Sequence, residues 1–148
     1  MKSAFIIFFL TWNLANCFAQ ANEEQAIIQV LEKESATWRS GDAQAHANCW
    51  HIQPYSRILV SIGDSTMIDV PPSAMINPPA NSFGKGGSSV NTNYRMNITG
   101  NNAWVSHDEE STAANGIKNY SSEFRILEKI NGEWKLVAQS IHIYRLKK

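Results

Sequence analysis

Two X-Asn-Gly sequences in the second half of the chain, 114–116 and 130–132, constrain the fold more than any other feature. Each lies between long runs of residues with β-strand composition, and Asn-Gly is a strong signal for a tight hairpin turn. We therefore expect four long strands in succession, over 90–99, 103–112, 117–129 and 133–144. Consecutive strands joined by short turns predict an antiparallel meander.

The length of each turn decides which side chains share a face of this sheet, because a slip of one residue moves every side chain to the other face. An X-Asn-Gly turn suits a three-residue loop closed by a glycine bulge as well as a two-residue loop. We take three-residue loops at both turns. His107 then lies opposite Glu123, and Glu123 lies opposite Gln139, so the three side chains form a row.

This register divides the strand residues between two faces. One face mixes apolar and polar side chains: Val105, His107, Glu109, Glu123, Arg125, Leu127, Val137, Gln139, Ile141 and Ile143. The other face is rich in aromatic and apolar residues, among them Trp104, Phe124, Ile126, Leu136 and Tyr144. The helices are needed to cover the first face, and monomers rarely leave a large apolar patch open. We therefore predict a homodimer packed through the second face.

The polar side chains of the first face are the candidate functional residues, because an apolar pocket with a few convergent polar groups is typical of a ligand site. His107 beside Glu123 can act as a general base oriented by a carboxylate, and these two are the candidate catalytic residues. Glu109, Arg125 and Gln139 are candidate ligand contacts. The alternative is a buried polar cluster that only satisfies its own hydrogen bonds and charges.

The first half of the chain predicts two helices. Asn22 and Gln25 have the spacing of a capping box, and apolar residues with helical periodicity follow. Gly41 suits the end of this helix, and Asp42 can cap a shorter one that reaches about Trp50. Short strands are expected over 57–61 and 66–70. A long loop follows over 71–89, which holds four of the five prolines and has room for a helical turn over 73–76.

Aromatic residues near the ends of these helices are further pocket candidates. Trp38, Trp50 and Tyr55 are expected at the rim, or alternatively in the core, and a large aromatic side chain can serve both roles. A metal site is not expected from His46, Cys49 and His51. On a helix the first two share a face, whereas His51 points elsewhere and no fourth ligand is in view. No P-loop or dinucleotide motif is present, so we expect no cofactor.

Residues 1–19 predict a signal peptide. Lys2 precedes an apolar stretch over 4–14, and the small residues Cys17 and Ala19 favour cleavage before Gln20. Lipid attachment at Cys17 is the alternative, although Asn16 fits that motif poorly. The apolar stretch is shorter than the roughly 20 residues of a bilayer span. We therefore expect a domain over 20–148 that is secreted or periplasmic and has no transmembrane segment.

Charge excludes one class of partner. The chain has 13 basic and 13 acidic residues and a formal net charge of zero, whereas a nucleic-acid binder needs a basic excess or patch. After cleavage Cys49 is the one remaining cysteine, so no internal disulfide is expected.

The order of these elements, and the residues at their junctions, resemble the nuclear-transport-factor-2-like superfamily and especially its SnoaL-like and calcium/calmodulin-kinase association-domain branches. The resemblance is carried by the sequences at 38–42, 103–106 and 127–137. It implies a cystatin-like, cone-shaped sheet wrapped around the long helix, with a pocket at the wide end. It also implies dimers. Arg125 matches a basic pocket position of the kinase domains, but Glu109 and Ile141 replace two others, so their ligand preference is not carried over.

Members of this superfamily include isomerases, dehydratases and hydrolases, as well as non-catalytic domains, so the fold does not decide the activity. We expect an exported α+β domain that binds an unknown small organic ligand. One alternative is an enzyme that uses His107 and Glu123 for proton transfer, dehydration or hydrolysis. Another is an oligomeric interaction module with a vestigial pocket.

Overall fold

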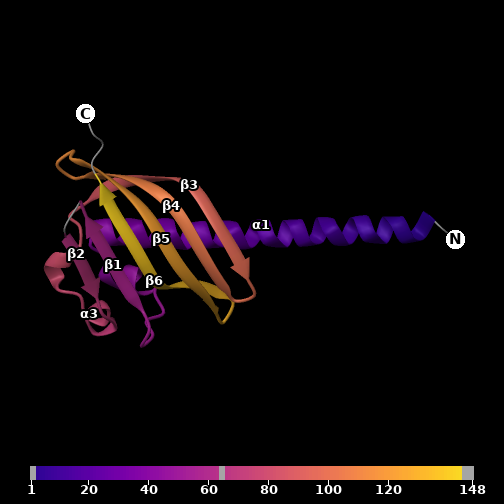
Figure 1. Ribbon diagram of the computed structural model, residues 1–148, viewed down its shortest axis with the longest axis horizontal. Coiled ribbons are helices and arrows are strands. Elements are labelled where there is room, and N and C mark those ends of the chain that lie inside the picture. Colours follow the sequence, from indigo (N-terminus) through magenta and orange to yellow (C-terminus); the bar gives the residue numbers. More distant parts are fainter. Residues whose placement is uncertain (1–2, 64–65, 145–148) are drawn as a thin grey trace.

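The computed structural model describes the backbone of residues 3–63 and 66–144 and the side chains of residues 20–63, 66–79 and 81–144. A long helix packs against a six-stranded sheet (Figure 1). The helical elements are α1 (Ser3–Ser40), α2 (Ala43–Ala47), α3 (Pro72–Ile76) and the 3-10 turn η1 (Ala80–Ser82). The strands are β1 (Arg57–Ile62), β2 (Thr66–Val70), β3 (Gly87–Thr99), β4 (Asn102–Ala113), β5 (Lys118–Ile130) and β6 (Glu133–Tyr144).

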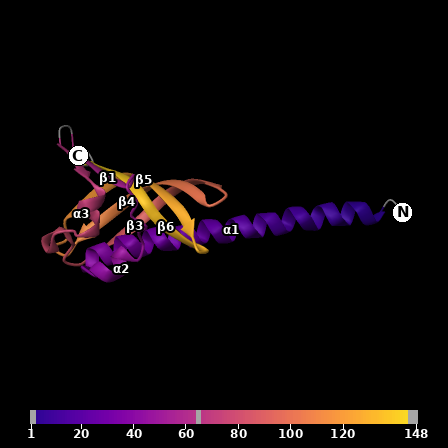
Figure 2. The same cartoon turned by 90° about the horizontal axis from the view of Figure 1, so that it is seen from below.

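The sheet has the strand order β2-β1-β6-β5-β4-β3. Strands β3 to β6 form the expected antiparallel meander, whereas β1 runs parallel to β6, so the sheet is mixed rather than wholly antiparallel. The sheet curves over α1, which runs along one of its faces (Figure 2). We call the face toward α1 the inner face. The expected α+β architecture, a curved sheet wrapped around a long N-terminal helix, is confirmed.

The turn between β4 and β5 has the expected three-residue loop. Ala113 donates its N–H to the carbonyl of Ile117 at 2.9 Å, and Gly116 has a φ of 81°, in the left-handed region. His107 therefore pairs with Glu123, as expected. Both are buried, which places them on the inner face.

The turn between β5 and β6 differs from the prediction. Ile130 pairs with Glu133, so the loop has two residues, and both Asn131 and Gly132 have positive φ, at 51° and 86°. A two-residue loop alone would move the side chains of β6 to the face opposite the predicted one. A bulge at Val137, which lies between the paired residues Leu136 and Ala138, reverses that change, so that Leu136 and Val137 are both buried.

The bulge keeps Gln139 on the inner face but moves its partner. Arg125, not Glu123, pairs with Gln139, and Glu123 pairs with Ile141. The predicted row of His107, Glu123 and Gln139 is therefore wrong. The row is His107, Glu123 and Ile141, with Arg125 and Gln139 paired beside it.

A second bulge lies in β3, where Thr92 pairs with Asp108 and Arg95 pairs with Ser106. Asn93 and Tyr94 both fall opposite His107 as a result. Asn93 has a φ of 58°, which asparagine tolerates better than most residues, and its side chain donates to Oδ2 of Asp108 at 2.8 Å. The residues turned inward are odd-numbered before the bulge and even-numbered after it, so Asn91 and Tyr94 lie on the same face.

Of the two predicted ends of the long helix, only the C-terminal end agrees with the structure. The expected start at Asn22 is wrong, because α1 passes through that residue without a break. Its end is as expected: Gly41 has a φ of 77°, and the side chain of Asp42 accepts a hydrogen bond from the N–H of Ala45 at 3.0 Å. Helix α2 stops at Ala47 rather than near Trp50, because Trp50 forms a parallel bridge to Leu136 of β6.

The core lies between α1 and the sheet, where Ile27 and Leu31 pack against Val105, Leu127 and Leu136. The segment 71–89 contains α3 and η1 and then returns to the end of α1. Gly84 donates to the carbonyl of Trp38 at 3.0 Å, and a Cβ there would lie 2.8 Å from the Cα of Arg39. This close approach requires glycine.

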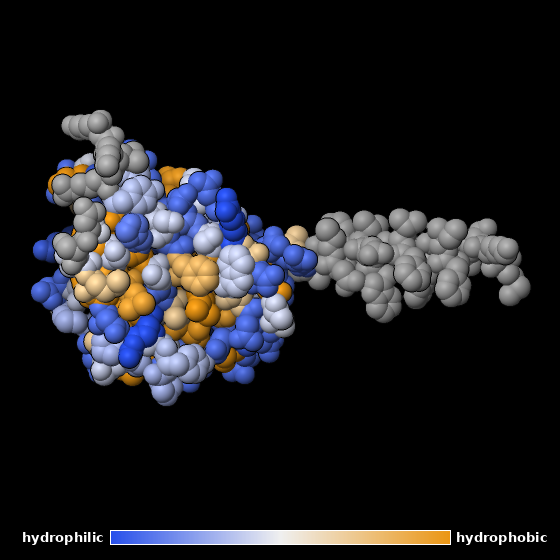
Figure 3. Space-filling model, in the orientation of Figure 1, coloured by the Kyte–Doolittle hydropathy of each residue, from blue (hydrophilic) through white to orange (hydrophobic). Residues whose placement is uncertain are grey.

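The outer face of the sheet exposes large apolar side chains. Trp104 and Phe124 stack with ring centroids 5.8 Å apart, and each is 42% exposed, next to Ile126. Figure 3 shows hydrophobic side chains gathered on the face turned to the viewer. Among the described residues, no helix is both long and apolar enough to span a bilayer.

Candidate functional site

The structure brings five predicted site residues together on the inner face. His107, Glu109, Glu123, Arg125 and Gln139 are all buried. Glu34 of α1, also buried, joins them because α1 lies against this face of the sheet. We call these six residues the inner-face cluster.

Arg125 is the centre of the charge network. Its Nη1 donates to Oε2 of Glu34 at 3.1 Å and also to Oε1 of Gln139, while its Nε donates to Oε2 of Glu123 at 3.0 Å and its Nη2 to the same oxygen. Burial opposes its charge, but the Glu34 and Glu123 carboxylates outweigh that effect and raise the pKa of Arg125. The guanidinium is therefore held by protein groups on each of its three nitrogens.

His107 lies beside this network without a hydrogen bond. Its Nε2 is 3.7 Å from Oε2 of Glu123, and neither ring nitrogen has a hydrogen-bond partner. Burial lowers the pKa of His107 below its ordinary value, although the Glu123 carboxylate acts in the opposite direction. Burial acts to raise the pKa of Glu123, yet Arg125, His107 and Ser121 together lower it. The pair is therefore an uncharged imidazole next to a carboxylate at neutral pH.

Further buried polar atoms without a hydrogen-bond partner lie on β3 and β4. They are the Tyr94 hydroxyl, Oδ1 of Asn91 and Oε2 of Glu109. The Tyr94 ring lies 5.2 Å from the His107 ring, and Asn91 pairs directly with Glu109. Asn91 and Tyr94 therefore form a group of four with His107 and Glu109, which we call the open polar group.

Glu109 connects this group to the end of α1. Its Oε1 accepts a hydrogen bond from Nη1 of Arg39 at 3.1 Å, and Arg39 also donates to the hydroxyl of Ser89. Burial raises the pKa of Glu109, the Glu123 carboxylate raises it further, and Arg39 acts against both. Glu109 therefore takes up a proton more readily than Glu123, whose pKa is lowered.

The three predicted rim aromatics have different surroundings. Trp38 is 36% exposed and packs against His46 and Phe83, with centroids 5.1 Å and 4.7 Å away; His46 in turn lies 3.7 Å from Glu34. Trp50 is half-buried against the core, and its Nε1 has no partner. Tyr55 is 61% exposed and donates to Glu128, which pairs with Asn102 at the end of the hairpin. The structure therefore does not bring Tyr55 to the cluster.

The histidines and cysteine near α2 each have a separate neighbour. Nδ1 of His46 lies 3.3 Å from the carbonyl of Glu34, Cys49 donates to Ala45, and His51 contacts Gln53. In the part of the chain that the structure describes, no three His, Cys, Asp or Glu side chains are grouped to hold a metal ion.

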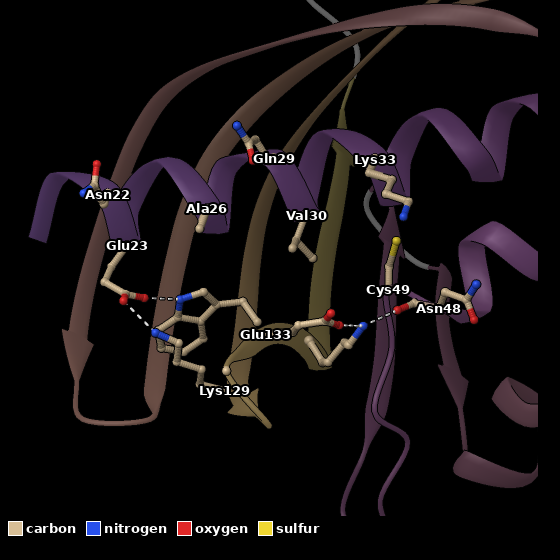
Figure 4. A pocket seen from close by; sticks show the side chains of 13 residues that line it. Asn22, Glu23, Ala26, Gln29, Val30, Lys33, Asn48, Cys49, Lys129 and Glu133 are labelled. Carbon is tan, nitrogen blue, oxygen red and sulfur yellow. Dashed lines mark hydrogen bonds and ion pairs between the residues drawn. The ribbon is translucent and has the colours of Figure 1, made fainter. Parts of the chain in front are cut away.

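A separate groove of about 460 Å³ lies between α1 and the β5–β6 hairpin (Figure 4). Ala26, Val30 and Trp134 give it an apolar floor, and charged pairs line its edges. Glu23 accepts hydrogen bonds from Nζ of Lys129 at 2.6 Å and from Nε1 of Trp134 at 2.7 Å. None of these residues belongs to the predicted site.

Sequence reasoning also missed Glu34, Asn91, Tyr94 and Arg39. A signal existed for Glu34, which follows Ile27 by seven residues and Leu31 by three and so occupies the apolar stripe of α1. A charged residue on that stripe requires a buried partner. No comparable signal existed for Tyr94, because its direction depends on the bulge at Asn93.

Comparison with known proteins bears on the fold. No protein-family model and no curated protein matches the chain. A solved NTF2-like protein of unknown function from Shewanella baltica is similar at 19% identity with a TM-score of 0.62, over 85% of this chain and 97% of that one. An NTF2-like protein with a cystatin-like fold from Novosphingobium aromaticivorans has 13% identity and a TM-score of 0.64, over 91% and 90%.

A third similar structure, also from Novosphingobium aromaticivorans, is provisionally named a scytalone dehydratase. It has 15% identity and a TM-score of 0.61, over 86% of this chain and 91% of that one. At such identities the likeness concerns the path of the backbone and not the chemistry of the site. By its helix, its curved sheet and these similarities, the chain has the nuclear-transport-factor-2-like, or cystatin-like, fold.

Proposed function

We propose that this protein binds a small organic molecule through the open polar group of Asn91, Tyr94, His107 and Glu109. The observation that supports this function is the set of buried polar atoms on these four neighbouring residues that make no hydrogen bond of ordinary length to the protein. Asn91 nevertheless lies close enough to the Tyr94 hydroxyl, and Ser35 close enough to the Glu109 carboxyl, to oppose the rise that burial causes in the pKa of each. Each unsatisfied buried group costs about 1–3 kcal/mol, and native proteins keep few of them. A ligand that hydrogen-bonds to them offsets this cost, which is the physical basis of its affinity.

The test is ligand-observed and protein-observed NMR with isotope-labelled histidine and tyrosine rings. A mixture of small aromatic and aliphatic fragments is expected to shift the ring resonances of His107 and Tyr94. His142 and Tyr144, which lie on the outer face, serve as internal controls in the same sample. Fragments that shift only the control rings, or none at all, would contradict the proposal.

A second candidate function is catalysis by proton transfer at the same site. It is supported by the uncharged His107 imidazole lying 3.7 Å from the Glu123 carboxylate, an arrangement in which the imidazole can take a proton and the carboxylate can stabilise the resulting cation. Glu123→Gln keeps the side-chain shape and removes the charge. Under this function the variant loses turnover of any substrate found while it still binds that substrate; under simple binding the affinity changes only modestly.

We also propose that the protein forms a dimer through the outer face of the sheet. Trp104, Phe124 and Ile126 provide adjacent exposed apolar side chains on neighbouring strands β4 and β5. A two-fold dimer uses the same patch on both subunits.

Export with removal of residues 1–19 remains our proposal for the location of the protein, and it rests on the sequence pattern alone. The mass of the intact protein recovered from its native host tests it. We expect a chain that begins at or near Gln20. A lipid on Cys17 would instead place the protein at a membrane surface.

A further inference from the structure

The groove between α1 and the β5–β6 hairpin is a hollow of its own, separate from the inner-face cluster. Its volume of about 460 Å³ falls in the range of small-molecule sites, about 300–1,000 Å³. The α1 residues that line it run from Asn22 to Lys33, which is about 17 Å of helix at 1.5 Å per residue. The groove is therefore long and follows the helix (Figure 4), a shape that fits an extended ligand better than a compact one.

The floor of the groove is apolar along its middle. Ala26 and Val30 lie one helical turn apart, are partly buried, and pack against the core. Trp134 of β6 lines the same stretch, with Nζ of Lys129 5.6 Å from its ring centroid. A hydrocarbon chain laid along this floor would remove apolar surface from water, and that burial is favourable in proportion to its area.

The charges at the Asn22 end of the groove are balanced. The carboxylate of Glu23 accepts hydrogen bonds from Nζ of Lys129 at 2.6 Å and from Nε1 of Trp134 at 2.7 Å. One ammonium group thus faces one carboxylate, and the indole N–H is also used. This end offers no net charge to a ligand.

The other end of the groove has an excess of positive charge. Oε2 of Glu133 lies 2.8 Å from Nζ of Lys135, which also donates to the carbonyl of Asn48 at 2.9 Å. Lys33 is exposed and makes no ion pair or hydrogen bond with any residue that the structure describes. The hydrogen bond from Lys135 lowers the pKa of Glu133, and the charge of Lys33 adds a smaller effect in the same direction. Two ammonium groups therefore lie near one carboxylate.

We infer that this groove binds an extended amphiphilic anion, a free aliphatic carboxylate, with its carboxylate at Lys33 and its chain over Ala26 and Val30. An uncharged amphiphile would make the apolar contacts and lack the ion pair, and an ammonium amphiphile would meet charges of its own sign. This site goes beyond the proposed function, because none of its residues belongs to the inner-face cluster or the open polar group.

Matched probes test the inference. Octanoate, 1-octanol and octylammonium share one chain length and differ in charge. The dissociation constant of each is read by NMR from the Nε1–H resonance of Trp134, and that of Trp104 on the outer face is the internal control. We expect octanoate to bind at least about fivefold more tightly than octylammonium, because an attraction replaces a repulsion. Equal or tighter binding of octylammonium would overturn the ligand class, and no shift of Trp134 with any probe would overturn the site.

A variant of Lys33 supplies the second measurement. Lys33→Gln should weaken octanoate about threefold to fivefold, the upper part of the range for an exposed ion pair, and leave 1-octanol unchanged. Lys85→Gln, which replaces an exposed lysine outside the groove, is the matched control and should alter neither. Equal losses for octanoate and 1-octanol would mean that Lys33 acts through its aliphatic stem, and would overturn the assignment of the carboxylate to its charge.

The same ligand chemistry occurs at the surface of an anionic membrane, and a vesicle experiment separates the two sources. Membrane surfaces are recognised by clusters of about 4–8 basic residues, whereas the groove has an excess of one. The protein should therefore stay in the supernatant when phosphatidylglycerol vesicles are sedimented. Binding to these vesicles that is lost in Lys33→Gln would overturn the free ligand in favour of a membrane surface.

Discussion

The centroid of the Tyr94 ring lies 5.2 Å from the centroid of the His107 ring, because a bulge at Asn93 places two residues of β3 opposite one residue of β4. Without that extra residue, Tyr94 and Asn91 would point to opposite faces of the sheet. The open polar group therefore depends on one backbone conformation, with a φ of 58° at a residue other than glycine.

Asn93→Val should destabilise the protein and disturb this arrangement. A β-branched residue in the left-handed region is strained by roughly 1–3 kcal/mol, and valine cannot donate to Asp108. Asn93→Gly, which accepts positive φ, should cost less and keep the bulge. The free energy of unfolding in urea and the nuclear Overhauser contact between the Tyr94 and His107 rings measure the two effects. A valine variant as stable as the glycine variant would show that the bulge is not maintained by this residue.

Replacing Arg125 should be far more damaging than replacing an exposed partner of an ion pair. Arg125→Met leaves Glu34 and Glu123 buried without their cation, at a cost of about 3–5 kcal/mol. Lys118→Met, which breaks the exposed pair with Glu110, should cost far less, because solvent screens that pair. The free energy of unfolding of each variant, measured by denaturant titration, compares the two costs.

Adding Glu34→Gln and Glu123→Gln to Arg125→Met should recover part of the loss, because the unpaired charges are then gone. No recovery in the triple variant would mean that Arg125 acts through packing rather than charge.

The stability of the protein should fall as the pH falls below 6.5, the ordinary pKa of histidine, through the protonation of His107. Its folded-state pKa is lowered, so the unfolded chain binds the proton first and stability rises with pH in this window. His107→Gln should flatten the slope of unfolding free energy against pH just below 6.5. A slope unaffected by His107→Gln would contradict the burial of an uncharged imidazole.

Glu109 should make the stability of the protein depend on pH in the opposite direction. Its folded-state pKa is raised above 4.5, so its contribution is present below that pH and is lost as the pH rises through the folded-state value. Relative to the wild type, Glu109→Gln should therefore become more stable as the pH rises above 4.5. The difference in unfolding free energy between the two proteins, measured at several pH values, gives the sign directly.

Ile126→Glu should convert the proposed dimer into a monomer, because it places like charges opposite each other in a two-fold interface. Ile76→Glu is the matched control, since Ile76 is also exposed but lies on α3 outside the sheet. Light scattering at micromolar concentration should show twice the monomer mass for the wild type and the control. A monomeric wild type would rule out the dimer.

The sequence alone determined the features that depend on neighbouring residues. The Asn-Gly turns marked the meander, and Gly41 and Asp42 marked the junction of the helices. The pairing of His107 with Glu123 followed only with a three-residue loop at 114–116, because the same motif at 130–132 forms a two-residue loop. Alternation along β4 and β5 then assigned Glu109 and Arg125 to the buried face, because side-chain direction in a regular strand follows from position alone.

The tertiary structure alone decided where that alternation breaks. The turn at 131–132 has two residues, which alone would place Val137 on the outer face. A bulge at Val137 lets both Leu136 and Val137 be buried on the inner face. The bulge at Asn93 does the same for Tyr94. The partner of Arg125 on α1, Glu34, is 91 residues away in the chain. Bulges and such long-range pairs are set by the packing of whole elements, and a local sequence pattern carries no information about which packing has the lowest free energy.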